Sequence, residues 1–353
     1  MNKRVRLVSF TSLLVIVAGL LTLAFSRPSE TLPQADLPQK LAEFSGMAQL
    51  TPLEVETLKA GQPVSKLLNS DAEHEIAVLG IVWIDAPISK YVQAIKDIEQ
   101  LERGDGFQIS RRISDPPRLS DFAALKLPEV DIEDLRVCRP GDCGLKLDEK
   151  AIARIQREVD WSKPTAVNEV NEIVRQELLR YVTTYQQSGN KGFPVYRDKD
   201  EPMDVATEFA SMVDGMPFLR QRAPALRQFL LEYPKAKLAN STSFFYWHKV
   251  SFGLKPVIRI NHVVIVPNAD HTLVASKQIY ASHYFLTALE LRDLIPDPAR
   301  GQGFWFVNIN RGRAGSLAGW KGRIIRGRVQ KEALEALTKG MEATRSFLER
   351  TTR

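Results

Sequence analysis

The stretch GIVWIDAPISKYVQAIKDIEQ, residues 80–100, decides the fold of this 353-residue chain. Its first half completes a run rich in Val and Ile that begins at Glu75 and is closed by Pro87, a pattern typical of a buried β-strand. Its second half, with Leu101 directly after it, places apolar residues at helical spacing, and these are Tyr91, Val92, Ile95, Ile98 and Leu101. The stretch therefore predicts a strand that leads directly into an amphipathic helix.

Four more strands are predicted after residue 240, and short turns separate them. They are SFFYWHKVSF (243–252), PVIRINHVVIVP (256–267), TLVASKQIYASHYF (272–285) and GFWFVNINR (303–311). Consecutive strands joined by short links imply antiparallel pairing. After Gly322 the chain reads as one long amphipathic helix, which must cover a face of that sheet.

The middle of the chain, about residues 115–240, is predicted to consist of helices and loops. Ser162 and the Lys-Pro pair after it start one helix, whose apolar side chains form a single face. Two further helices are predicted at about 202–213 and 217–233. The chain is 44% hydrophobic and 25% charged, which is ordinary for a globular protein, so most of it is expected to fold.

Residues 1–26 predict an export segment, because basic residues at the start of the chain precede an apolar run at 7–25. This is the layout of a signal peptide, with cleavage after Ser26. The run also nearly reaches the roughly 20 apolar residues that span a bilayer, so an uncleaved anchor stays open. Both readings of the segment place the folded part outside the cytoplasm, in the periplasm or cell envelope. We expect residues 27–70 to be a tether with a lead-in helix, and residues 71–353 to be the folded domain.

The charge balance and the absence of catalytic motifs exclude several classes of function. The formal net charge is +6, and three of the basic residues belong to the export segment, so the exported part carries +3. A nucleic-acid partner is therefore not predicted. The sequence contains no G-x-S-x-G, no P-loop and no G-x-G-x-x-G after a strand. No catalytic residue and no cofactor are predicted.

The two cysteines, Cys138 and Cys143, lie in the segment CRPGDC. An even count, an oxidising compartment and a Pro-Gly turn predict one local disulfide, whose small ring would fix a loop. Redox chemistry and free thiols stay open, although redox motifs usually place two residues between the cysteines. A zinc site would need further ligands, and no histidine lies nearby.

The order of these elements resembles the helix-grip superfamily, which includes START lipid-transfer domains and polyketide cyclase-like proteins. Residues 80–100, with their Asp-Ala-Pro corner, and the block from Phe244 to Leu348 carry the resemblance. It implies an α+β fold in which a curved antiparallel sheet grips the long C-terminal helix, with about 115–240 as a large helical insertion. It also implies an apolar cavity between sheet and helix that binds a lipid or other hydrophobic small molecule, mostly without catalysis.

Three histidines fall in the predicted strands, and strand alternation places each on the more apolar face of its strand. With polar neighbours they form the predicted ligand-binding set, which is Tyr246, His248, His262, Lys277 and His283. Three histidines around one cavity could also bind zinc with an open coordination position, which would favour an extracytoplasmic enzyme. Hydrogen-bonded histidines without a shared role would fit the same pattern. A cell-envelope scaffold that presents residues 148–233 to a partner is a third hypothesis for the function.

A run of basic residues without any acidic one extends from Arg311 to Lys331. The predicted contacts with an anionic membrane surface are Arg311, Arg313, Lys321, Arg323, Arg326 and Arg328. A solvated start of the last helix would give the same run. Cations are unfavourable at a helix start, because the helix dipole is positive there, and this favours an anionic partner.

Overall fold

The structure is a computed structural model that describes residues 37–70, 73–103, 106–197, 199, 202–251 and 255–350. The predicted export segment, residues 1–26, and the first part of the predicted tether lie outside these residues. Residues 35–353 form one compact unit. Within the described ranges, no helix is long and apolar enough to cross a membrane.

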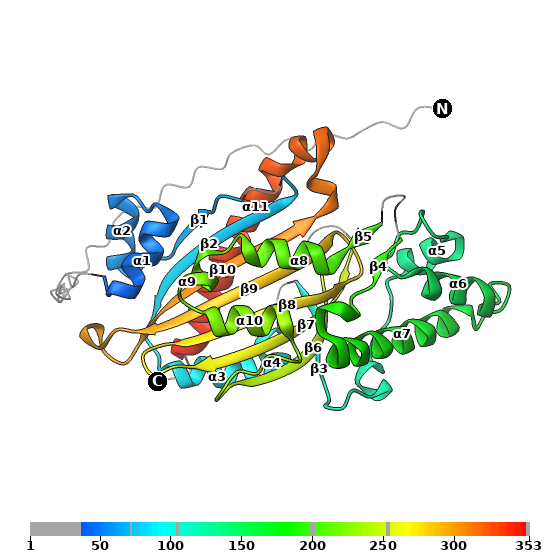
Figure 1. Cartoon of the computed structure of the whole chain (residues 1–353), viewed down its shortest axis with the longest axis horizontal. Helices are drawn as coiled ribbons and strands as arrows, with labels where there is room; N and C mark the ends of the chain where they lie inside the picture. Colours follow the sequence, from blue (N-terminus) through cyan, green and yellow to red (C-terminus); the bar gives the residue numbers. More distant parts are fainter. Residues whose placement is uncertain are drawn as a thin grey trace, which may run out of the picture. The chain divides into compact units, whose positions relative to one another are not determined.

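An antiparallel sheet of eight strands forms the centre of the described part of the chain (Figure 1), in the order β1-β2-β10-β9-β8-β7-β6-β3. The strands are β1 (Val64–Leu67), β2 (Glu75–Ile84), β3 (Phe107–Ile113), β6 (Thr242–Val250), β7 (Val257–Pro267), β8 (Thr272–Ala281), β9 (Phe285–Pro296) and β10 (Phe304–Ala314). A short pair, β4 (Val195–Tyr196) and β5 (Met203–Asp204), lies apart from it. The predicted α+β class, with a large antiparallel sheet and a C-terminal helix, is confirmed.

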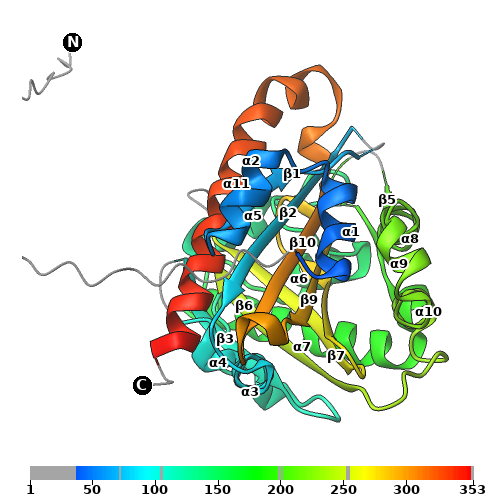
Figure 2. The same ribbon diagram turned by 90° about the vertical axis from the view of Figure 1, so that its left-hand side faces the viewer.

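Helices cover both faces of the sheet, which explains why nearly every side chain of β2 is buried. One face, called here the α11 face, carries α3 (Ile88–Lys96), α4 (Ile98–Leu101) and α11 (Gly319–Arg350). The opposite face, called the insertion face, carries α1 (Gln39–Ala48), α7 (Ala166–Ser188), α8 (Val205–Asp214), α9 (Pro217–Gln221) and α10 (Pro224–Glu232). Figure 2 shows α11 on one side of the sheet and α8, α9 and α10 on the other.

The remaining helices lie at the margins of these layers. They are α2 (Pro52–Lys59), α5 (Glu129–Val137), α6 (Glu149–Glu158) and the single-turn elements η1 (Leu119–Phe122), η2 (Gly189–Gly192), η3 (Pro298–Arg300) and η4 (Gly315–Leu317). Thr51 caps α2 with a capping box: its hydroxyl accepts from the backbone N–H of Glu54, and its own N–H donates to the Glu54 carboxylate. This local start signal fixes the beginning of α2 after α1.

Close packing joins α11 to β2. A Cβ built at Gly80 of β2 would lie 2.6 Å from the sulfur of Met341 and 3.0 Å from a methyl group of Leu337. Only glycine leaves room for this approach, so side chains of α11 fill the space over β2.

Several predicted elements differ from the observed ones. The predicted helix over residues 89–101 breaks at Asp97 into α3 and α4. The predicted helix at 217–233 breaks before Pro224, because proline cannot donate the backbone hydrogen bond of a helix interior. The predicted tether at 27–70 contains α1, whose Leu41 and Phe44 are buried in the core. Strand β9 has no counterpart among the predicted strands, and the predicted strand at 272–285 ends at Ala281.

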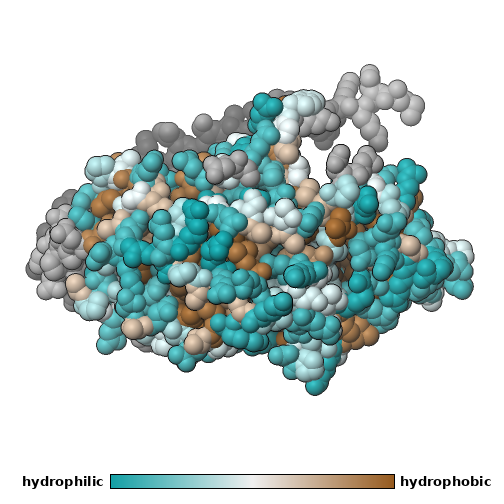
Figure 3. Space-filling view, viewed as in Figure 1, coloured by the Kyte–Doolittle hydropathy of each residue, from teal (hydrophilic) through white to brown (hydrophobic). Residues whose placement is uncertain are grey.

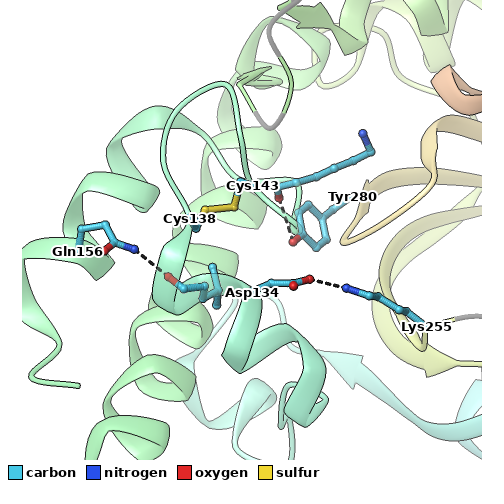
Figure 4. The surroundings of a disulfide bond; sticks show 8 residues. Asp134, Cys138, Cys143, Gln156, Lys255 and Tyr280 are labelled. Atoms are coloured by element: carbon cyan, nitrogen blue, oxygen red, sulfur yellow. Dashed lines mark hydrogen bonds and ion pairs between the residues drawn. A yellow bond between two sulfur atoms is a disulfide. The ribbon is translucent and has the colours of Figure 1, made fainter. Parts of the chain in front are cut away.

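The predicted disulfide between Cys138 and Cys143 is confirmed, and it closes the loop after α5 (Figure 4). The loop next to it is tied to the sheet, because Tyr280 donates its hydroxyl to the carbonyl of Lys146 at 3.2 Å. Asp134 of α5 and Lys255 also form an ion pair. The disulfide therefore fixes a segment that other contacts already hold.

Replacing both cysteines by serine is expected to lower the free energy of unfolding by about 2 kcal/mol, because so short a loop removes little entropy from the unfolded chain. Urea denaturation measures the loss, and hydrogen exchange should show faster exchange confined to the segment around α5. The reduced wild-type protein is the matched control and should behave alike. Global loss of structure in the serine variant would contradict this local role.

Candidate ligand site on the sheet

A group of polar side chains crosses the α11 face of the sheet at mid-strand. The group, called here the polar strip, consists of Tyr246, His248, Arg259, Asn261, Ser276, Gln278, Glu290, Arg292 and Asn308. The strand registers align these residues, since Asn261 is opposite both Tyr246 and Gln278, and Arg292 is opposite Asn308. Apolar rows of the same face lie toward the α3 end, where Leu294 and Phe306 are buried. The face is thus amphipathic along its strands.

Glu102, which directly follows α4, holds one end of the polar strip. Its Oε2 lies 2.8 Å from His248 Nδ1 and accepts from the Ser110 hydroxyl at 2.6 Å, while its Oε1 accepts from the Tyr246 hydroxyl at 2.9 Å. Burial opposes ionisation of Glu102, but His248 and these hydrogen bonds outweigh it and lower the pKa of the carboxyl. This end of the strip is internally satisfied.

Glu290 and Arg292 form an ion pair at the other end. Arg292 Nη1 donates to the Ser276 hydroxyl at 3.1 Å, and Asn308 Nδ2 donates to Glu290 Oε1 at 2.9 Å. Although β9 has a strand on each side, the side chains of Glu290 and Arg292 remain 28% and 13% exposed. Solvent therefore reaches the middle of this face.

Arg259 lies between the two ends and has no carboxylate partner among the described residues. Its Nε donates to Gln278 Oε1 at 2.8 Å, and its guanidinium lies over the ring of Phe285 at 5.2 Å. Burial lowers the pKa of Arg259, because the charged form loses solvation, although the carboxylates of Glu290 and Glu102 act on it in the opposite direction without forming an ion pair with it. Arginine stays charged at neutral pH even so, which leaves a partly buried cation available to an anion.

Two buried polar atoms of the strip lack a hydrogen-bond partner among the described residues. They are Nε2 of Gln278 and Oδ1 of Asn308, in residues that are only 1% and 6% exposed. Buried polar groups in folded proteins nearly always have a partner, which can be protein, water or ligand. Gln278 Nε2, beside Arg259, marks a place that an anionic group can complete, whereas Asn308 Oδ1 is an acceptor and needs a donor such as water.

The structure does not bring the three predicted histidines together. His248 lies on the polar strip, His262 projects from the insertion face, and His283 contacts the carboxylate of Asp131 at 3.0 Å beyond the end of β8. The three histidines therefore do not share one cavity, and within the described residues no cluster of histidine, cysteine, aspartate and glutamate could hold a metal ion.

Lys277, predicted as a ligand contact, is fully buried on the insertion face. Its Nζ lies 4.0 Å from the ring centre of Phe209, 4.9 Å from that of Phe193 and 5.0 Å from that of Tyr185. It donates to the carbonyl of Leu230 at 3.3 Å. Burial lowers the pKa of Lys277 well below its usual value. These contacts fasten α7 and α10 to the sheet, and we assign Lys277 a structural role.

Arg311 and Arg313, predicted as membrane contacts, are buried instead, because their side chains extend from β10 into the insertion face. Both pair with Glu75, at 2.8 Å each, and Arg313 also binds Glu208 at 2.9 Å. They line a polar cavity of about 340 Å³ beside Ser211. The Nε and both Nη atoms of Arg313 already donate to protein oxygens, so we do not assign a ligand to this cavity.

The other predicted membrane contacts belong to α11. Arg323 and Arg328 are exposed, and Arg326 donates to the backbone carbonyl of Glu75 at 2.9 Å. The side chain of Lys321 lies outside the described residues. The predicted surface is therefore reduced to the first turns of α11.

A comparison with protein-family models and with curated proteins finds no match to this chain. The function must therefore be argued from the polar strip. Sequence reasoning missed Arg259, Gln278, Glu290, Arg292 and Asn308 as site residues. The signal that could have found them is the recurrence of polar residues in one phase of several strands.

Proposed function

We propose that this chain binds an amphipathic small molecule with an anionic head, such as a fatty acid or a lipid, on the polar strip without covalent chemistry. Arg259 is the observation that carries the proposal. Its guanidinium can pair with a carboxylate or phosphate through two parallel hydrogen bonds, and the adjacent Gln278 Nε2 can donate a third. A neutral hydrophobic ligand would leave these donors unsatisfied.

The proposed position of the ligand's apolar part follows from excluding the space over β2. Leu337 and Met341 fill the space over β2, so the closed cavity beneath the last helix that the helix-grip resemblance implies is not part of the proposal. The ring of Phe285, which is partly exposed beside Arg259, and the partly exposed Ala288 offer apolar surface over β9. We therefore propose that the ligand lies over β7 to β9.

Replacing Arg259 by alanine is expected to weaken binding of oleate about tenfold to a hundredfold, because a charge-assisted hydrogen-bonded pair contributes roughly 1.5–3 kcal/mol. Titration calorimetry measures the affinity, and native mass spectrometry of protein purified from its own envelope tests for a co-purifying lipid. Oleate methyl ester, which lacks the charge, is expected to bind the wild type as weakly as oleate binds the Arg259→Ala variant.

The matched control is Arg157→Ala on α6, whose side chain is 68% exposed and far along the chain from the strip. It should bind oleate as the wild type does. Equal affinity for oleate and its methyl ester, or undiminished binding by Arg259→Ala, would remove the basis of the proposal.

Neither an enzyme nor a scaffold function receives support from a specific observation. The enzyme hypothesis relies on a single face that carries three histidines, and these lie apart. The scaffold hypothesis needs a contiguous apolar patch on residues 148–233, and in the described part of this range the exposed large apolar residues are the separate Val167 and Val195. Figure 3 shows the apolar residues of the insertion face scattered among polar ones. We do not propose either.

A further inference from the structure

The first turns of α11 expose large apolar side chains. Trp320 is 67% exposed, Ile324 is 73% exposed and Ile325 is 43% exposed. Figures 1 and 2 both show this end of α11, in orange, projecting past the end of the sheet. Trp320 and Ile324 are four residues apart and so share one side of the helix. This projecting end, residues 319–331, is called here the α11 tip.

Exposed cations flank these apolar residues. The side chains of Arg323, Arg328 and Lys331 are 72%, 82% and 78% exposed. Lys331 follows Trp320 by eleven residues, close to three full turns, so it lies on the same side of the helix. Their contacts with Glu73, Glu332 and Glu335 are between exposed groups and hold them weakly.

The α11 tip also opposes the helix dipole. No acidic residue lies in the first turn of α11, where the positive end of the dipole favours anions. Every charged residue from 319 to 331 is basic. An external anionic surface would stabilise both the cations and the helix start.

We propose that the α11 tip docks on an anionic phospholipid bilayer, with Trp320 and Ile324 at the depth of the head groups. Tryptophan favours the membrane interface, and basic side chains near an anionic surface add to the attraction. The tip projects as a convex end that mixes cations with apolar side chains, which suits insertion among head groups better than a flat protein contact. This docking is independent of the proposed ligand site.

The test uses the full chain with vesicles whose acyl chains are brominated and quench tryptophan. The other four tryptophans are buried or only partly exposed, so the difference between wild type and Trp320→Phe reports Trp320 alone. We expect strong quenching of Trp320 by phosphatidylglycerol vesicles, little by phosphatidylcholine vesicles, and loss of quenching at high salt. Because quenching reports the depth of the tip, it is separate from any attachment through residues 1–26.

Each charge removed should raise the anionic lipid needed for half-maximal quenching about fivefold, so the double variant Arg323→Gln/Arg328→Gln should need about 25-fold more. The matched control is Arg139→Gln/Arg157→Gln, whose side chains are 76% and 68% exposed on another part of the chain, and it should behave as the wild type. The proposal is overturned if Trp320 stays unquenched while the chain sediments with vesicles. Equal quenching by both lipids, an equal loss in the control, or a salt-independent dimer that covers Trp320 would also overturn it.

Discussion

Replacing Glu75 by alanine is expected to lower the free energy of unfolding by about 3–5 kcal/mol, the largest effect we expect of any single substitution. Glu75 is 1% exposed, and each of its carboxylate oxygens accepts a hydrogen bond at 2.8 Å, one from Arg311 and one from Arg313. Its removal would leave two buried guanidinium groups with too little negative charge. Urea denaturation at neutral pH measures the loss.

A matched control separates burial from charge. Glu332 pairs with Arg328 at 2.7 Å on the surface, and Glu332→Ala should cost less than about 1 kcal/mol because both groups are exposed. If Glu75→Ala also lowers the free energy of unfolding by less than about 1 kcal/mol, the prediction is contradicted. Water from the adjoining polar cavity would then replace the lost carboxylate.

The strands that sequence patterns predict are those whose apolar residues form continuous runs. Strand β2 and most strands of the C-terminal sheet have such runs, and α11 is predicted in the same way by the helical spacing of its apolar residues. Strand β9 escapes such a pattern because Glu290, Arg292 and Asp293 interrupt its apolar residues. Glu290 and Arg292 pair with each other, and their further partners come from other strands and turns, since Asn308 binds Glu290, Ser276 binds Arg292 and His271 lies 2.6 Å from Asp293. Such pairs exist only after the sheet has formed.

The candidate site can be predicted only strand by strand. Alternation tells which residues of one strand share a face, and Tyr246 and His248 do lie side by side on the polar strip. It does not tell how the faces of different strands correspond, because register and bulges decide that. A register shift between Ile260 and Asn261 against β8 is one such feature. The register of β6 and β7 decides the position of His262: His248 is opposite Arg259, and His262, three residues further along β7, lies on the other face.

The basic run predicts the wrong surface for a related reason. Arg311 and Arg313 are near α11 in sequence, but they belong to the alternating side chains at the end of β10. Their acidic partner, Glu75, is 236 residues before Arg311 and becomes a neighbour only because β10 pairs with β2. The run of basic residues thus predicts an exposed surface at Arg311 and Arg313, whereas in the folded sheet both side chains are buried and pair with Glu75.

The second large effect is a loss of stability in acid that arises from His262. Its ring lies among four aromatic rings, nearest to Phe245 at 4.3 Å and Tyr233 at 4.6 Å, and its Nε2 has no hydrogen-bond partner among the described residues. Burial is the main cause that lowers the pKa of His262 from 6.5 to about 3. The folded protein therefore stays neutral at His262 at pH values where the unfolded chain binds a proton.

This difference in proton binding sets the direction in which the free energy of unfolding changes with pH. Above pH 6.5 neither state is protonated at His262 and the stability is complete, whereas from pH 6.5 down to about 3 only the unfolded chain gains the proton. The free energy of unfolding should fall by about 1.4 kcal/mol per pH unit in that window. Between about pH 6.5 and pH 5 the carboxylates of the chain stay largely ionised, so they contribute little to the slope, and a variant of His262 is needed to assign the slope to this one of the five histidines.

Substituting leucine, which is close to histidine in volume, tests the source of this acid sensitivity. His262→Leu should flatten the dependence of unfolding free energy on pH between about 7 and 5, measured by urea denaturation at several pH values. Phe122→Leu is the control in the same hydrophobic cluster, because the Phe122 ring stacks on Trp247 and its loss should lower stability equally at every pH and leave the slope unchanged. If the acid slope survives in His262→Leu, protonation of this buried ring is not what destabilises the fold, and another buried group must exchange the proton.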